Sequence, residues 1–485
     1  MSSIQKKFFY NTILSITQVL FPLIIFSYVA RVIEPIGIGK VAFVESICRY
    51  AILIAALGIP IYGVREVAKL KEDKIKLSKL CSELISIHLI SSLLISLVYL
   101  IIVSITSKLN DHLNFYLIGL VMIFSNIFSI EWYFQGIGDF KFITIRTLIV
   151  RIVTTILVFF MVTKPEHSFN FFLLTVFTNL IISIINLWHA NKYLAIKLTF
   201  QVKNLKQHLK PLLLIFSTTI SISIYVLLDT IMLGLLSDEK AVGFYSMALK
   251  ISKIPMLFVG ALGLVLIPQL SFSFSNKDYD RFNMLISKSI NFVITFSFPI
   301  IFYIMSVSDE LIHVFAGEQF LGASLSLKIL STLVLLIGLS NIFGMQILTP
   351  MGKDKYLTYS VVFGTVFSLS LNYILIPLYK EIGAVITNVI TEIIVTGMTF
   401  YYASKFIKLD LKYTFIVKSF LLSIPFYFFS SLISKFTINN ITILIGTSVL
   451  AGFYFLIMQF YLLKNEIIID LKNNLKHKIW PNTII

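Results

Sequence analysis

About fourteen apolar stretches, each near 20 residues long, occupy almost all of this 485-residue chain. The hydrocarbon core of a bilayer is about 30 Å thick, and a helix needs roughly 20 apolar residues to cross it. Inside that core only helices and closed barrels satisfy their own backbone hydrogen bonds. The pattern therefore predicts an all-α polytopic membrane protein. The expected spans are 9–30, 40–61, 81–105, 113–130, 143–162, 169–189, 211–234, 243–270, 289–307, 324–348, 357–378, 382–403, 413–433 and 441–462.

Composition excludes a soluble globular domain, since 57% of residues are hydrophobic, 13% are charged and the mean hydropathy is +0.91. The formal net charge of +16 could suggest a nucleic-acid partner. Most lysines, however, lie in short loops between the apolar stretches, as in the positive-inside pattern of membrane proteins. We therefore expect no nucleic-acid partner. The two cysteines, Cys48 and Cys81, indicate neither a disulfide framework nor a metal site.

The loops differ in charge on the two sides of the expected membrane domain. Basic residues gather near 65–79, 192–210, 277–288, 353–355 and 405–412 and after 463. The alternate loops carry little more than Lys108, Lys164, Lys240, Lys380 and Lys435. This asymmetry predicts that both termini are cytoplasmic. The N-terminal stretch is read as a retained first helix, because a signal peptide has a shorter apolar core and a small-residue cleavage site.

The longest basic loop divides the chain into two similar halves. Gly39 to Arg49 reads GKVAFVESICR and Gly243 to Lys253 reads GFYSMALKISK, with glycine and the basic residue at matching offsets. Paired halves with a substrate held between them are a recurring plan of transporters. We expect two pseudo-symmetric six-helix lobes and two further helices. The expected parts are an N-terminal lobe (1–195), a basic cytoplasmic linker (196–210), a C-terminal lobe (211–404), and helices thirteen and fourteen with a cytoplasmic tail (405–485).

Several ionisable residues fall inside the expected spans, where each costs at least about 2.5–3.5 kcal/mol and usually faces a cavity or a partner. The basic candidates are Arg31, at the end of the first span, and Arg49, Arg146, Arg151, Lys250, Lys253 and Lys328; the acidic candidates are Glu45, Asp229 and Glu392. The basic excess predicts a cationic cavity for an anionic ligand such as phosphate or pyrophosphate. Two alternatives stay open: Arg31 and Arg146 could reach an interface, and Glu45 with Arg49 could form a structural ion pair.

Several segments together resemble the polysaccharide-transporter branch of the multidrug/oligosaccharidyl-lipid/polysaccharide exporter superfamily, the Wzx-type O-antigen flippases. They are a first helix with Asn11, Gln18, Pro22, Tyr28 and Arg31, then GIGKVAF near Gly37, GIPIYGVREVAK from Gly58, EWYFQGIGDFKFITIRTLIVR from Glu131, VGFYSMALKISK from Val242, and LTPMGKDK before residue 357. Amide side chains within the spans, Asn179 among them, fit either interhelical hydrogen bonds or sugar contacts.

The resemblance implies a bacterial inner-membrane flippase without catalytic activity. Such proteins move undecaprenyl-pyrophosphate-linked repeat units from the cytoplasmic to the periplasmic leaflet. A polysaccharide polymerase and a chain-length regulator are then expected partners, beside the membrane lipids. The family's cationic central cavity maps onto Arg31, Arg49, Arg151, Lys250 and Lys253.

Two rival functions remain at this point. A multidrug antiporter of the same superfamily would depend on the acidic residues. An integral-membrane polymerase, ligase or acyltransferase would need a catalytic loop, and the segment 308–323 with Asp309, Glu310, His313 and Glu318 is the one candidate for it. No GxxxxGK[ST] nucleotide-binding segment is present. We expect no cofactor; the energy source could be H⁺ or Na⁺ exchange at the acidic residues, or the membrane potential.

Overall fold

The computed structural model describes residues 3–409 and 411–463. Within these residues every regular element is helical, and nine helices are long and apolar enough to cross a membrane. A tenth span results if the bent pair Glu318–Leu330 and Leu333–Leu348 is counted as one. The prediction of an all-α polytopic membrane protein is confirmed, and the count of fourteen spans stays a prediction.

The chain forms two compact units, residues 1–243 and 244–485. This division falls beyond the predicted linker 196–210, because helix α9 (Val202–Leu236) packs against α1, α2 and α3 of the first unit. The predicted lobe boundaries at 195 and 211 stay a prediction. Helix α10 (Glu239–Ser275) runs across the division.

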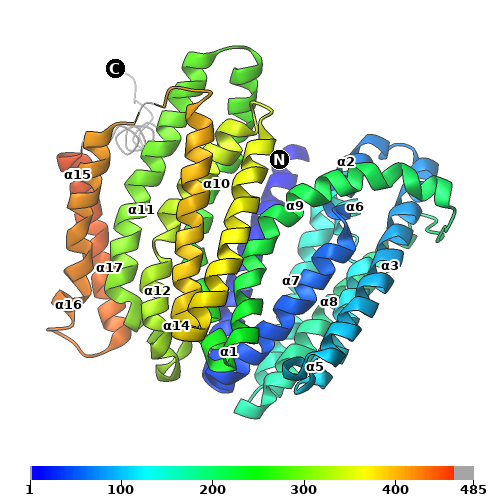
Figure 1. Ribbon diagram of the computed structural model, residues 1–485, viewed down its shortest axis with the longest axis horizontal. Helices are drawn as coiled ribbons and strands as arrows, with labels where there is room; N and C mark the ends of the chain where they lie inside the picture. Colours follow the sequence, from blue (N-terminus) through cyan, green and yellow to red (C-terminus); the bar gives the residue numbers. More distant parts are fainter. Residues whose placement is uncertain (1–2, 410, 464–485) are drawn as a thin grey trace, which may run out of the picture. The chain divides into compact units, whose positions relative to one another are not determined.

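The first unit is a bundle in which α1 packs against α3, α5, α7, α8 and α9 (Figure 1). Two short helices, α2 and α6, pack against each other at one end of it. Its elements are α1 (Ser3–Ala56), α2 (Ile59–Leu70), α3 (Lys74–Ile105), α4 (Ser107–Asn110), α5 (Leu113–Ile127), α6 (Glu131–Ile137), α7 (Phe140–Met161), η1 (Pro165–His167), α8 (Ser168–Asn191) and α9.

The second unit is organised around α11 (Tyr279–Ala316), which contacts α12, α13, α15, α16 and α17. The two expected C-terminal spans pack on this helix, where Phe426 and Met458 are buried in a common cluster. The other elements are η2 (Glu318–Ala323), α12 (Ser324–Leu330), α13 (Leu333–Asn341), η3 (Ile342–Leu348), α14 (Asp354–Ser404), α15 (Tyr413–Ser423), η4 (Ile424–Phe428), α16 (Phe429–Ile433), α17 (Asn440–Ile457) and η5 (Met458–Leu462).

Two long helices each contain a sharp break. Helix α1 is interrupted at Glu34, where φ is 60° and ψ is 178°, and Pro35 follows. Proline disfavours helical geometry in the residue before it and is well tolerated at the start of a helix. Helix α14 is interrupted at Lys380, with φ of 50° and ψ of −128°. The breaks fall between the predicted spans 9–30 and 40–61, and between 357–378 and 382–403.

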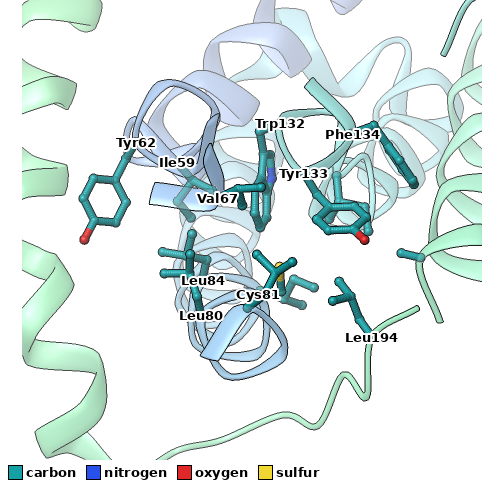
Figure 2. Close-up of a cluster of buried hydrophobic side chains, with 14 of the residues drawn as sticks. Ile59, Tyr62, Val67, Leu80, Cys81, Leu84, Trp132, Tyr133, Phe134 and Leu194 are labelled. Atoms are coloured by element: carbon teal, nitrogen blue, oxygen red, sulfur yellow. The ribbon is translucent and has the colours of Figure 1, made fainter. Parts of the chain in front are cut away.

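A dense aromatic and aliphatic core, part of which Figure 2 shows, closes one end of the first unit. The loop charges predict that this end is cytoplasmic, and we call it the inner end. Helices α2, α3 and α6 and the segment after α8 each contribute buried side chains to it. Burying one such side chain contributes about 1.5–3 kcal/mol. The members drawn in Figure 2 include Ile59, Tyr62, Val67, Leu80, Cys81, Leu84, Trp132, Tyr133, Phe134 and Leu194.

The predicted linker is docked along α3 and does not cross open solvent. Its first part is extended, and the backbone N–H groups of Ala195, Lys197 and Thr199 donate to the hydroxyl oxygens of three serines of α3. These serines, Ser78, Ser82 and Ser86, are spaced four residues apart, about 6 Å along a helix, and two residues of extended chain span about 6.6 Å. The two repeats match closely enough for three successive hydrogen bonds. We call this contact the serine ladder.

The second part of the linker is the beginning of α9, and a buried polar chain fastens it to α3 and α2. His208 Nε2 lies 2.9 Å from a carboxylate oxygen of Glu83, and His208 Nδ1 lies 2.8 Å from the Tyr62 hydroxyl. With Glu83 ionised, Nε2–H donates to the carboxylate and Nδ1 accepts from the hydroxyl. Gln207 also donates to the same carboxylate oxygen, at 3.3 Å. The beginning of α9 is therefore fixed to α2 and α3.

Candidate functional site

A cavity of about 490 Å³ opens within the first unit, near the end that carries the aromatic core. Helices α1, α2, α5, α8 and α9 all contribute to its wall. The lining residues are Arg49, Ile52, Leu53, Ala56, Pro60, Met122, Ser125, Asn126, Ser129, Asn179, Ser183 and Leu227. Among these residues Arg49 is the charged one, and six of the other eleven have apolar side chains.

Arg49 reaches this cavity in an ion pair with Glu45, one helical turn before it on α1. The Arg49 Nε and Nη2 atoms donate to one carboxylate oxygen of Glu45, at 2.8 and 2.6 Å. The Arg49 side chain is 54% exposed, and the Glu45 side chain 24%. The outer guanidinium nitrogen Nη1 has no hydrogen bond within the described residues, so the group keeps donors for an anion.

The polar wall of the cavity was largely missed by sequence reasoning. Asn179 was recognised as a candidate, with interhelical bonding as its alternative. Ser125, Asn126 and Ser129 were not singled out, although they form the polar run SNIFS at the end of an expected span. Three polar residues within five positions are unusual inside an apolar stretch, and this is the signal that could have found them.

Arg146, predicted to line the cavity, lies elsewhere in the first unit. Its side chain is 2% exposed on α7 and pairs at 2.5 Å with Glu131 at the start of α6. It also donates to the Asn186 side chain of α8 at 2.7 Å. These contacts tie α6, α7 and α8 together. The proposed contact of Arg146 with a ligand stays a prediction.

Arg151 and Arg31 are also outside the cavity wall. Arg151, half-buried on α7, donates to the backbone oxygen of Thr17 at 2.6 Å and so joins α7 to α1. Arg31 is exposed on α1, three residues before the break at Glu34. The side chains of Asn11 and Gln18 lie outside the described part of the chain.

The remaining basic candidates belong to the second unit. Lys250 and Lys253 are exposed and lie three residues apart on α10. Lys328 lies 3.4 Å from Asp309, joining α12 to α11 beside a largely exposed carboxylate. Their proposed contact with a ligand stays a prediction.

The acidic candidates lie in three different settings. Glu45 is paired with Arg49, as described above. Asp229 is buried on α9, with 1% of its surface exposed. Glu392 is buried on α14 and accepts a hydrogen bond from the Ser340 hydroxyl at 2.7 Å. Within the described residues no group of three or more His, Cys, Asp and Glu side chains could hold a metal ion.

At the opposite end of the first unit, the break of α1 meets the beginning of α10 through two glycines. A Cβ on Gly39 would lie 1.7 Å from the backbone oxygen of Glu239, and a Cβ on Gly243 would lie 2.1 Å from that of Pro35. Gly39 thus faces Glu239, four residues before Gly243, and Gly243 faces Pro35, four residues before Gly39. These are the glycines that begin the two matching sequence segments, so the internal repeat coincides with a reciprocal backbone contact. We call it the glycine contact.

Ion pairs surround the glycine contact. Glu239 pairs with Lys40 at 3.6 Å and with His112, and Lys108 donates to the backbone oxygens of Leu235 and Ser237. The Lys40, His112 and Glu239 side chains are each 25–30% exposed. The loop charges predict that this end of the unit faces outside the cell, and we call it the outer end.

Comparison with known proteins gives the chain a family and a fold. Residues 4–274 match the family described as "Polysaccharide biosynthesis protein", and residues 215–374 match the family MatE. A protein of Escherichia coli (strain K12) that carries the name O-antigen transporter is 25% identical over 407 residues, 82% of this chain and 95% of that protein. The capsular polysaccharide biosynthesis protein CapF of Staphylococcus aureus is 23% identical, covering 82% of this chain and 99% of CapF.

Solved structures share the fold at low sequence identity. The lipid II flippase MurJ in an inward closed conformation aligns with a TM-score of 0.72 and 16% identity, covering 92% of this chain and 98% of that one. An inward-facing multidrug resistance transporter of the MATE family aligns with a TM-score of 0.62 and 14% identity, covering 80% of this chain and 94% of that one. Because the family match spans more than half of the 485 residues, the chain belongs to the polysaccharide biosynthesis protein family.

Proposed function

We propose that this protein is a flippase for lipid-linked oligosaccharides. Its substrates are undecaprenyl-pyrophosphate-linked repeat units of a surface polysaccharide, moved from the cytoplasmic to the periplasmic leaflet of a bacterial inner membrane. The family, the relative named as an O-antigen transporter and the fold shared with a lipid II flippase support this function. The function requires no catalytic residue and no cofactor.

The observation that carries the proposal is Arg49 in the wall of the 490 Å³ cavity. Its guanidinium is held in place by Glu45 through two hydrogen bonds to a single oxygen. An orienting carboxylate leaves the outer donors of the group aimed away from the helix, where a phosphate can accept from them. Partial neutralisation by Glu45 also suits a site that must release its anion after each cycle. Arg151, Lys250 and Lys253 are further candidates for the pyrophosphate.

Transport by alternating access requires that the cavity be closed toward one face at a time. The glycine contact is a candidate for the outer closure, because it brings two helix ends to backbone distance beyond the cavity. The polyprenyl chain stays in the lipid throughout, since drawing it into a polar cavity would forfeit about 0.8 kcal/mol for each CH₂ group.

The energy source is proposed to act through acidic residues or through the membrane potential. Glu45, Asp229 and Glu392 could exchange H⁺ or Na⁺, and each 100 mV contributes about 2.3 kcal/mol for each charge moved. A polysaccharide polymerase and a chain-length regulator are the expected partners on the product side.

The second candidate function is a multidrug antiporter, favoured by the match of residues 215–374 to MatE. The antiporter and the flippase differ in the residues on which transport depends. An antiporter for cations depends on Asp229 and Glu392, and loss of Arg49 would leave it active.

Complementation separates the two functions. A flippase-null Gram-negative strain with the matching polysaccharide cluster would express the wild type or one of the variants Arg49→Ala, Arg151→Ala, Lys253→Ala, Asp229→Asn and Glu392→Gln at checked levels. We expect the wild type to restore surface polysaccharide, and the three basic-residue variants to lose most of it. Restoration by all three basic-residue variants, with drug resistance that depends on Asp229 and Glu392, would instead establish the antiporter.

A further inference from the structure

The cavity carries a neutral polar wall on α8. Asn179 and Ser183 lie one helical turn apart, and both line the cavity. The Asn179 side-chain nitrogen donates to the Thr175 backbone oxygen at 2.9 Å, which leaves its carbonyl oxygen to accept another hydrogen bond. The Ser183 side chain is 2% exposed, and its hydroxyl has no hydrogen-bond partner within the described residues. A buried hydroxyl without a protein partner is rare in native proteins, and a polar group bound in the cavity would satisfy it.

Helix α5 and the residues after it supply a second polar wall. The side-chain amide of Asn126 makes no hydrogen bond within the described residues, so two donors and one acceptor are available. Ser129 lies close by in the chain and lines the same cavity. Ser125, also in the wall, already donates to the Met122 backbone oxygen at 3.0 Å. The two polar walls together offer donors and acceptors without any added charge.

The other surfaces of the cavity are apolar. Ile52 and Leu53 of α1, Met122 of α5 and Leu227 of α9 line it. The described wall of the cavity therefore combines three kinds of surface: the cation of Arg49, neutral amides and hydroxyls, and aliphatic groups.

This combination selects among ligand classes. A bare pyrophosphate would be held best by several cations, and the described wall has one. A hydrophobic drug would leave the free amides without partners, which costs about 1–3 kcal/mol for each buried polar group. A sugar ring next to a phosphate matches all three surfaces, since its hydroxyls both donate and accept and its C–H faces are apolar.

We propose that Asn126, Asn179 and Ser183 bind the sugar ring that is linked directly to the pyrophosphate, and that they set the selectivity for this sugar. This inference rests on the proposed function and names the part of the substrate that the first unit recognises. The volume agrees, because small-molecule sites span about 300–1,000 Å³ and a cavity of about 490 Å³ holds a sugar and its phosphates but not a polyprenyl chain.

The test is equilibrium binding by the purified full-length protein in detergent, with three synthetic probes. They are undecaprenyl pyrophosphate, the same lipid carrying glucose, and the same lipid carrying galactose. The variants are Asn126→Ala, Asn179→Ala and Asn170→Ala. Asn170 is the matched control, because it lies on α8 outside the cavity and its side chain donates to the Met161 backbone oxygen.

We expect the wild type to bind at least one sugar-bearing lipid about tenfold or more tightly than undecaprenyl pyrophosphate, which corresponds to one or two good hydrogen bonds. Asn126→Ala and Asn179→Ala should bring that affinity close to the value for the bare lipid and leave the bare lipid's own affinity unchanged. Asn170→Ala should bind like the wild type.

Two results would overturn the proposal. Equal affinity of the wild type for all three lipids would show that no sugar is recognised, and unchanged affinities in both cavity variants would place the sugar elsewhere. In either case binding of the bare lipid keeps the proposed flippase function intact. A wild type that binds none of the three probes would remove the flippase function and the inference together.

Discussion

The helices of the first unit are held together in different ways at its two ends. At the inner end, α9 and the segment before it are fastened by the serine ladder, the buried Glu83–His208–Tyr62 chain and the aromatic core. At the outer end, the glycine contact brings backbone against backbone, with half-buried ion pairs around it. The groups that form the inner attachment are buried, whereas those around the outer contact are partly exposed to solvent.

This difference indicates which end can open. Separating the inner attachment would break the hydrogen bonds of the buried carboxylate and histidine and expose aromatic side chains to water. Each of these losses costs about 1 kcal/mol or more. Separating the outer contact exposes two glycines, backbone atoms and ion pairs that already touch water. We therefore expect α9 to stay fixed at the inner end while the outer contact opens and closes during transport.

The largest effect should come from crowding the glycine contact. Gly243→Ala places a methyl group where the Pro35 backbone oxygen lies, and overpacking of this kind costs about 1–3 kcal/mol. Because the cost falls on the closed outer contact, the transport rate should fall about 10- to 100-fold. The measurement is the initial flipping rate in vesicles. The control is Gly260→Ala on the same helix, where no atom lies within 4 Å of an added Cβ; equal losses in both variants would remove the special role of the contact.

The inner polar chain should give the largest effect on stability. His208→Ala leaves the Glu83 carboxylate buried with Gln207 and the more distant Lys79, so the free energy of unfolding should fall by about 2–3 kcal/mol. Tyr62→Phe removes a single hydrogen bond and should cost about 1 kcal/mol. The apparent unfolding temperature in detergent reports both. If His208→Ala unfolds at the wild-type temperature, the inner attachment is not held by this chain.

The serine ladder should contribute less. Ser82→Ala removes the acceptor of the Lys197 N–H and should lower the free energy of unfolding by about 1 kcal/mol. Ser92→Ala on the same helix is the control, since the Ser92 hydroxyl is buried without a partner in the described structure and its loss should be neutral. Hydrogen exchange of the 195–199 amides measures the ladder directly. Faster exchange in Ser92→Ala than in Ser82→Ala would contradict this assignment.

The smallest effect should come from the outer ion pairs. Glu239→Gln keeps the size of the side chain and removes its charge toward Lys40 and His112. Part-exposed pairs contribute about 0.2–1 kcal/mol and are screened by salt, so the change in unfolding temperature should be small and should vanish at high ionic strength. A loss as large as that of His208→Ala would show that charge, and not close fit, holds the outer end.

Sequence patterns predicted the all-α membrane fold because bilayer thickness and backbone hydrogen bonding leave few alternatives. The four-residue spacing of Glu45 and Arg49 left an ion pair open as an alternative, and the structure shows the two side chains paired. Arg146 shows where such reasoning stops. Its partner Glu131 lies on another helix, and a contact between helices cannot be predicted from the residue spacing along one of them.

The linker is a second example of a contact that one segment of the sequence does not predict. The sequence predicted a basic cytoplasmic linker over residues 196–210, and the lysines of this stretch are exposed. The backbone of this stretch is nevertheless bonded to α3, because serines four residues apart happen to match the repeat of an extended chain. This match can be recognised only when the positions of the linker backbone and of the α3 serines are both known. The polar wall of the cavity likewise combines residues from α5 and α8.

The central claim is that Arg49 holds the pyrophosphate of a lipid-linked sugar in the cavity of the first unit. The most direct test is the initial rate at which vesicles containing the purified protein flip an undecaprenyl-pyrophosphate-linked oligosaccharide, for wild type, Arg49→Ala and the exposed-arginine control Arg65→Ala. Losing hydrogen bonds from a charged donor costs about 1.5–3 kcal/mol. We predict a rate about 10- to 100-fold lower for Arg49→Ala and an unchanged rate for Arg65→Ala. Equal rates for all three proteins, at equal amounts of folded protein, would contradict the account.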